Sequence, residues 1–182
     1  MEAVKTLNNS KIIKSFLIVI FGTGLLTISS KVQTPFTLVP ATMQTFVVLF
    51  LGMVLGYKLA AATVTLYLIE GLIGLPVFAK GSGFVYLIGP TGGYLVGFIF
   101  TSFFAGMIKT NNDPIIVSIY LLLSVSVAYI FGLLWLWNYM GLDKSFNSVF
   151  LVGAQPFLVI EIYKILILSV LSKQLLKIRN FI

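Results

Sequence analysis

Six long apolar stretches alternate with polar or glycine- and proline-containing breaks along this chain. They run from about residue 12 to 29, 44 to 57, 59 to 75, 84 to 108, 115 to 139 and 148 to 172. A helix of about 20 apolar residues crosses a hydrocarbon core about 30 Å thick. The pattern therefore predicts an all-α integral membrane protein, a single domain over residues 1–182 built as a bundle of six transmembrane helices. Only Tyr57 and Lys58 divide the second and third stretches, which predicts a tight helical hairpin there.

Lysine and arginine are distributed unevenly between the two ends of the predicted bundle. Six crossings place both termini on one side, and positive residues accumulate on the cytoplasmic side of membrane proteins. The side of the termini carries most of them, so both termini are predicted to be cytoplasmic. The first stretch is too long for the core of a signal peptide, so no cleavage is expected. The residues on the side of the termini are Lys5, Lys11, Lys14, Lys58, Lys109, Lys173, Lys177 and Arg179; those opposite are Lys31, Lys80 and Lys144.

Composition excludes several classes of function. The chain is 59% hydrophobic and 9% charged, and it contains neither cysteine nor histidine. It therefore lacks thiolate chemistry, the commonest metal ligand and the commonest general base. We expect no metal site, no cofactor and no enzymatic activity. The net charge of +7 is interpreted as a topology signal rather than as a nucleic-acid surface, because the basic residues lie between apolar stretches.

Small residues mark the faces on which the helices are expected to pack. Lipid tails provide little hydrophobic drive for helix association, so close backbone approach at small side chains becomes important. The sequence offers three such sets: Gly52 and Gly56; Gly93 and Gly97; and Ser124, Ala128 and Gly132.

Two connecting segments are too apolar for open loops. Residues 31–42 include two prolines, and residues 76–83 include two glycines. Irregular backbone at membrane depth must be buried in protein or line a cavity. On the predicted topology both segments lie outside, where they could cover a pocket open to the exterior. Ordinary connectors are the alternative.

Glu161 and Lys164 are the most informative residues for function. They lie three residues apart, on one face of the last apolar stretch. Each charge costs about 2.5–3.5 kcal/mol at the centre of a bilayer, so such residues face the bundle interior and mark functional sites by default. The alternative is a structural ion pair that ties two helices together. Glu70, at the end of the third stretch, is as easily solvated or structural as ligand-binding.

Three further polar or aromatic positions are weaker candidates. Gln44 and Thr45 begin the second apolar stretch, where they could either bind a ligand or cap the helix. Trp135 closes the fifth stretch, where an interfacial aromatic belt is favoured over a ligand wall.

Four sequence blocks resemble those of a known family. They are Leu75-Pro76-Val77-Phe78-Ala79; Gly89-Pro90-Thr91-Gly92-Gly93-Tyr94-Leu95-Val96-Gly97-Phe98; Val39-Pro40-Ala41-Thr42-Met43-Gln44-Thr45; and Gln155-Pro156-Phe157 with Glu161 and Lys164. Together these blocks are similar to the BioY family, the biotin-specific substrate-binding (S) components of energy-coupling factor (ECF) transporters. The resemblance covers about residues 31–173.

The resemblance implies a six-helix protein of the bacterial inner (cell) membrane that captures biotin from outside. It implies as partners a transmembrane coupling subunit and two cytoplasmic ATPase subunits, besides the surrounding lipid. Catalysis and ATP binding would belong to those partners, in agreement with the lack of a Walker motif in this sequence.

A biotin pocket needs an acceptor for the ureido N–H groups, a donor for the ureido oxygen, apolar walls and a group that meets the carboxylate. Glu161 and Lys164 are assigned to the first two needs. The further candidates are Gln44, Thr45 and Tyr94 as polar contacts, Phe36, Phe78 and Trp135 as walls, and Lys80, which could contact the carboxylate or merely face water. Glu161 stands where the family usually has aspartate, and the first stretch lacks the alanine-spaced motif that S components often carry.

Two other functions stay open on the residues alone. The chain could be a structural subunit of a membrane complex, with Glu161 and Lys164 as a tie between helices. It could also be an ion-coupled carrier that works alone, with Glu161 as the proton site.

Overall fold

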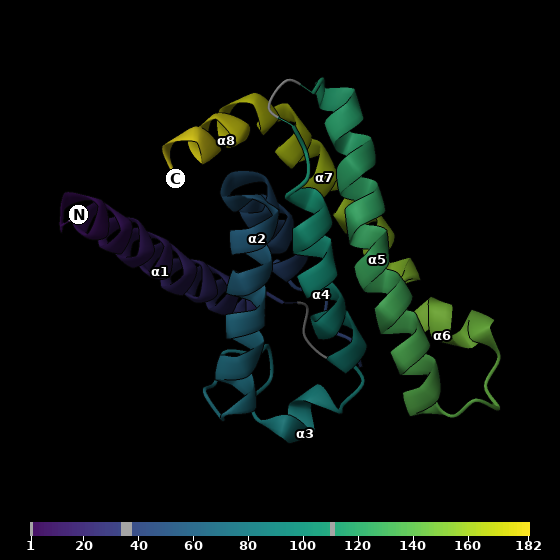
Figure 1. The fold of residues 1–182 in the computed structure, drawn as a ribbon. Coiled ribbons are helices and arrows are strands. Elements are labelled where there is room, and N and C mark those ends of the chain that lie inside the picture. The colour runs from purple at the N-terminus through teal and green to yellow at the C-terminus, as the bar shows by residue number, and fades with distance from the viewer. Residues whose placement is uncertain (1, 34–37, 110–111) are drawn as a thin grey trace.

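The computed structural model describes residues 2–33, 38–109 and 112–182. Within these ranges the regular elements are helices, and pairing of extended backbone is limited to two isolated bridges. The α-helices are α1 (Glu2–Lys31), α2 (Gln44–Leu72), α3 (Phe84–Leu87), α4 (Gly92–Ala105), α5 (Pro114–Met140), α6 (Phe146–Gly153), α7 (Leu158–Val170) and α8 (Ser172–Ile178). Two short 3₁₀ helices, η1 (Gln155–Phe157) and η2 (Arg179–Phe181), follow α6 and α8 (Figure 1).

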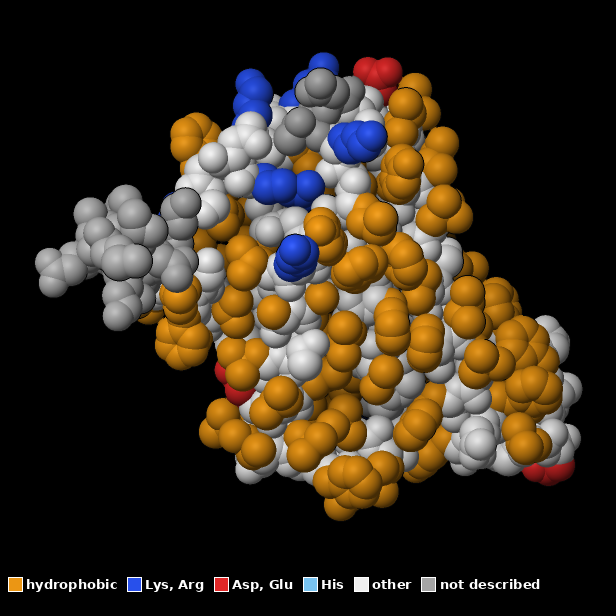
Figure 2. Space-filling model, in the orientation of Figure 1, with side chains coloured by type: hydrophobic (Ala, Val, Ile, Leu, Met, Phe, Trp, Pro, Cys, Tyr) orange, Lys and Arg blue, Asp and Glu red, His pale blue; other side chains and the backbone are white. Residues whose placement is uncertain are grey.

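Four segments are long and apolar enough to cross a membrane: Ile12–Lys31, Gln44–Leu72, Pro114–Met140 and Phe146–Val170. The 14-residue helix α4 is apolar but shorter. Hydrophobic side chains cover the flanks of the molecule in Figure 2, whereas lysine and arginine gather at one end. An exposed apolar surface of this extent suits contact with lipid. The chain is a multi-pass integral membrane protein.

Helix α2 folds back on itself at Gly56. The backbone there has φ 74° and ψ 167°, a conformation that glycine adopts without strain. Gln44 at one end of α2 donates from Nε2 to the Tyr67 hydroxyl at 2.8 Å, whereas 23 residues of straight helix would span about 34 Å. The two arms are therefore antiparallel. The predicted hairpin is present, with its turn one residue before Tyr57.

Small residues bring α4 against both of its neighbours, as the sequence predicts. A Cβ atom built on Gly97 would lie 2.7 Å from the Ala128 Cα of α5, and one on Gly52 would lie 2.7 Å from the Ala105 Cβ of α4. Distances below 3.0 Å leave no room for a side chain. The backbones of α2, α4 and α5 consequently lie side by side (Figure 1).

Two of the predicted apolar helices are interrupted. The stretch 84–108 divides into α3 and α4 around Pro90, and the stretch 148–172 divides into α6 and α7 around Pro156. Proline lacks the N–H group that a helix interior needs, and it disfavours helical backbone in the residue before it. Both interruptions lie close to the cavity described below.

The chain's last residues are fastened to the end of the molecule where the basic side chains gather. Arg179 Nε donates to the Met53 carbonyl at 2.9 Å, and Nη1 donates to the Ile108 carbonyl at 2.9 Å. Lys14 of α1 donates to the Phe181 carbonyl. Burial lowers the pKa of the Arg179 guanidinium, which stays charged because its ordinary pKa exceeds about 12. This contact set joins α1, the α2 turn, the segment after α4 and the C-terminal segment.

Candidate functional site

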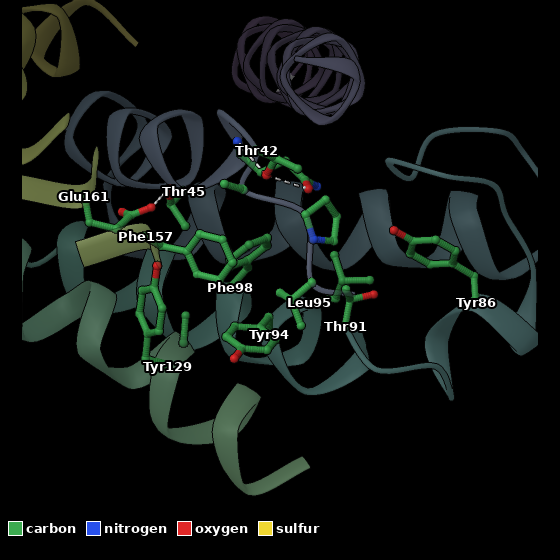
Figure 3. A pocket seen from close by; sticks show the side chains of 15 residues that line it. Thr42, Thr45, Tyr86, Thr91, Tyr94, Leu95, Phe98, Tyr129, Phe157 and Glu161 are labelled. Carbon is green, nitrogen blue, oxygen red and sulfur yellow. Dashed lines mark hydrogen bonds between the residues drawn. The ribbon is translucent and has the colours of Figure 1, made fainter. Parts of the chain in front are cut away.

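A cavity lies between the segment before α2 and helices α2, α4, α5 and α7. It contains about 540 Å³ of empty space, including the part open at its mouth. Figure 3 shows the side chains that line it, with Glu161 and Tyr129 at one end and Tyr86 at the other. Ligand sites are largely apolar with a few placed polar groups. The mixed lining of this cavity fits that description.

A hydrogen-bonded cluster closes the inner end of the cavity. Glu161 Oε1 accepts from the Thr45 hydroxyl and from the Lys164 ammonium, both at 2.8 Å. Lys164 also donates to the Thr45 hydroxyl and to the Thr42 carbonyl, both at 2.7 Å. The cluster therefore links α7 to the beginning of α2 and to the segment before it.

Both charged side chains are nearly inaccessible: Glu161 is 6% exposed and Lys164 3%. A buried charge is costly unless it is paired and hydrogen-bonded. The 2.8 Å contact pairs the two, and it forms between residues one helical turn apart. This pairing explains how the two charges persist inside an apolar bundle.

The second carboxylate oxygen of Glu161 is different. Oε2 is buried and has no hydrogen-bond partner within the described part of the chain. Glu161 lines the cavity, and the Tyr129 side chain points toward its carboxylate (Figure 3). An acceptor left unpaired in a buried site costs about 1–3 kcal/mol, and more when it is charged. A ligand that donates a hydrogen bond to Oε2 relieves this cost.

The neutral polar candidates of the sequence analysis occupy the same cavity. Gln44 and Thr45 line it, and the Gln44 amide is held between the Tyr67 and Thr42 hydroxyls. Tyr94 also lines it and donates to the Gly153 carbonyl at 2.8 Å. The Tyr94 ring is packed against Gly132, where a Cβ atom would lie 2.2 Å from it.

Other candidates lie elsewhere. Phe78 is fully buried in the core, stacked on Tyr86 with ring centroids 5.0 Å apart, and it is not among the side chains that line the cavity. Trp135 packs outside the cavity, where its indole N–H donates to the Gly89 carbonyl at 2.9 Å. Lys164 does not line the cavity, but its ammonium contacts Glu161 and Thr45, which do. Phe36 falls outside the described residues.

The two connecting segments predicted to cover a pocket contact each other. Gln33 donates from Nε2 to the Ala79 carbonyl at 3.1 Å, and Lys31 donates to the Phe78 carbonyl. In the first segment, Val39 to Thr42 line the cavity. In the second, Lys80 lines a neighbouring hollow.

Several lining residues were missed from the sequence. Tyr129 could have been noticed, because a hydroxyl in the middle of an apolar stretch seeks a polar partner. Thr91 and Tyr86 come from the interrupted region between α3 and α4. The remaining apolar walls, Leu95, Phe98, Ala128 and Phe157, carry no sequence signal that separates a cavity wall from an ordinary core position.

The fold and the site together define a polytopic α-helical membrane protein that contains a cavity of mixed polar and apolar lining, with a buried ion pair at its inner end. Comparison with known proteins makes the class specific. The chain belongs to the BioY family, whose sequence profile matches residues 3–181.

Relatives from different organisms match over most of their length. A protein of Pyrococcus horikoshii named probable biotin transporter BioY is 32% identical over 89% of this chain and 96% of its own. The biotin transporter BioY of Thermotoga maritima is 32% identical over 85% of this chain and 91% of its own. The crystal structure of the S-component for biotin from an ECF-type ABC transporter superimposes with a TM-score of 0.80 at 25% identity, covering 93% of this chain and 94% of that one.

Proposed function

We propose that this chain is the biotin-binding S component of an ECF-type transporter, and that it captures biotin from outside the cell for import. Family membership, relatives named biotin transporters and the likeness to a biotin S-component support this function. The observation that carries it at the site is the buried, unpartnered Oε2 of Glu161 facing the cavity.

The polar and apolar groups of the cavity match the chemistry of biotin. Glu161 Oε2 accepts a ureido N–H, while Gln44, Thr45 and Tyr94 are the nearby neutral polar groups. Phe98 and Phe157 flank the apolar ring system. The valerate chain leads away from Glu161, and its carboxylate ends at the cavity's outer end, on the side of Lys80. Binding is non-covalent, so the chain acts as a binding component and not as an enzyme.

The same proposal includes six membrane crossings with both termini in the cytoplasm. The crossings are α1, the two arms of α2, α4, α5, and α6 with α7. Supporting the orientation, basic residues collect at the end formed by α8, the α2 turn and the segment after α4 (Figure 2), and such residues favour the cytoplasmic side. The cavity's outer mouth then faces the exterior.

The proposed partners are those that the resemblance to ECF S components implies. Capture in the cavity must be followed by release on the other side of the membrane, and the sequence contains no Walker-type nucleotide-binding loop. A transmembrane coupling subunit and two cytoplasmic ATPase subunits would supply the work. Nucleic acid is not a proposed partner.

Titration of the purified protein with biotin, and with thiamine and riboflavin in parallel, tests the proposal. Saturable binding of biotin alone is the expected result. If no vitamin binds or raises the unfolding temperature, the cavity is not a vitamin site. That result would favour the alternative that the chain is a structural subunit of a membrane complex. Biotin uptake by vesicles that contain only this chain, abolished when the proton gradient is dissipated, would favour the ion-coupled carrier instead.

A further inference from the structure

A second hollow, the outer hollow, lies next to the outer end of the binding cavity. This outer hollow contains about 810 Å³ of empty space, including its open mouth. It shares the lining residues Pro40, Tyr86 and Thr91 with the binding cavity. The two spaces are therefore adjacent along one path, with the Glu161 end of the cavity farthest from the outer hollow.

The direction of a bound ligand follows from the ends of the cavity. Glu161 and Tyr86 lie at opposite ends in Figure 3, with Phe98 and Leu95 between them. A ligand whose ring system donates to Glu161 extends its chain toward Thr91 and Tyr86. The carboxyl end of the ligand's side chain thus reaches the boundary between the cavity and the outer hollow.

The lining of the outer hollow suits a polar, flexible group. It includes Lys80, Ser82 and Tyr139, whose side chains carry an ammonium and two hydroxyl groups, and the exposed Val85. These groups offer donors and a positive charge to a carboxylate. The open mouth leaves the added group in contact with water, so little polar surface is desolvated.

We propose that this chain also binds biotin amides, in which the biotin carboxyl is joined to an amine such as the side-chain nitrogen of lysine. The biotin portion occupies the binding cavity, and the added group occupies the outer hollow, where its own carboxylate lies near Lys80. This inference rests on the proposed function, because it uses the same cavity and the same ligand orientation.

Titration of the purified protein with biotin and with Nε-biotinyl-lysine tests the inference. We expect biotinyl-lysine to bind within about tenfold of biotin. Val85→Trp adds bulk inside the outer hollow and should weaken biotinyl-lysine binding by about tenfold or more, with biotin binding unchanged. Phe84→Trp is the matched control, because Phe84 is exposed on the same short helix and does not line the hollow.

The outcomes separate this inference from the proposed function. Biotin binding without biotinyl-lysine binding overturns the inference and leaves the function standing, whereas binding of neither overturns the function. If Val85→Trp weakens both ligands equally, or neither, the added group does not occupy the outer hollow and the inference is wrong.

Discussion

Lys164 directs its ammonium group at three protein oxygens: the Thr42 carbonyl, the Thr45 hydroxyl and the Glu161 carboxylate. An ammonium group has three hydrogens to donate, so this arrangement leaves none for a ligand. The geometry thus does not support direct donation from Lys164 to a ureido oxygen. Its contribution to binding is to balance the charge of Glu161 and to fix the segment before α2 against α7.

Replacing Glu161 should remove the acceptor that faces the cavity. In Glu161→Gln the amide N–H₂ must point either at the Lys164 ammonium or at the ligand N–H, and both are donors. A hydrogen bond to a charged group contributes about 1.5–3 kcal/mol, so we expect biotin affinity to fall by about 10- to 100-fold. Calorimetric titration measures it. Asp143→Asn, in the exposed α5–α6 connection, is the control; equal loss in both variants would contradict the assignment.

Removing Lys164 should harm both binding and folding. Lys164→Ala leaves Glu161 as an unpaired buried charge, a change that costs about 3–5 kcal/mol, and it frees the Thr42 carbonyl. We expect biotin affinity to fall by orders of magnitude and the unfolding temperature to drop. Lys144→Ala, at an exposed position, should change neither quantity. Wild-type affinity in folded Lys164→Ala protein would show that the pair does not organise the site.

At the level of single residues, the sequence was most informative for charged side chains, because burying a charge has a high free-energy cost. Charges inside an apolar stretch have few acceptable environments, so Glu161 and Lys164 could be singled out, and the structure pairs them. Aromatic side chains have many acceptable environments. Phe78 lies in the core and Trp135 at the surface. A pattern of apolar positions does not distinguish either of these environments from the wall of a cavity.

Among the elements, the helices and the α2 hairpin could be predicted, but two interruptions could not be placed. Apolar length alone joins α3 to α4 and α6 to α7, because average hydrophobicity does not respond to one proline. The backbone does respond, since Pro90 and Pro156 each remove a helical donor. Both breaks border the cavity, and they bring Tyr86, Thr91 and Phe157 into its lining.

The contact between α4 and α5 should depend on Gly132. In Gly132→Ala the new methyl group would lie about 2.2 Å from the Tyr94 ring, so the ring must shift and its hydrogen bond to the Gly153 carbonyl is strained. Overpacking of this kind costs about 1–3 kcal/mol. We expect a lower unfolding temperature in detergent and weaker biotin binding.

Gly24→Ala provides the matched control, because a methyl group at Gly24 in α1 meets nothing within 4 Å. It should leave binding unchanged and leave stability equal or slightly raised, since alanine is the better helix former. Equal effects of the two substitutions would mean that the Tyr94 ring is not tightly packed against Gly132.

At the scale of the whole molecule, basic residues that are far apart in the sequence gather at one end of the structure (Figure 2). Lys14 and Arg179 meet the backbone at one end of the bundle, although 165 positions separate them in the sequence. The sequence indicated the shared side through the positive-inside pattern. It could not indicate that Arg179 inserts among backbone carbonyls, because that contact depends on where η2 docks.

Replacing Arg179 should loosen this end without altering the binding cavity. Arg179→Gln loses donors to the carbonyls of Gly52, Met53 and Ile108, and hydrogen bonds from a charged group contribute about 1.5–3 kcal/mol. We expect the unfolding temperature to fall while biotin affinity is unchanged. Lys177→Gln, exposed in α8, should be neutral in both assays. A large loss of affinity in Arg179→Gln would show that the two ends are coupled.

The position of Arg179 also bears on how the protein is made. A ribosome releases the N-terminal helices first, so the α2 turn and the segment after α4 emerge long before residue 179. Helix ends leave carbonyl groups in need of donors, and here a late guanidinium supplies them. Arg179 consequently completes an end of the protein built from helices that are made much earlier, and nascent chains stopped before residue 179 would lack these hydrogen bonds.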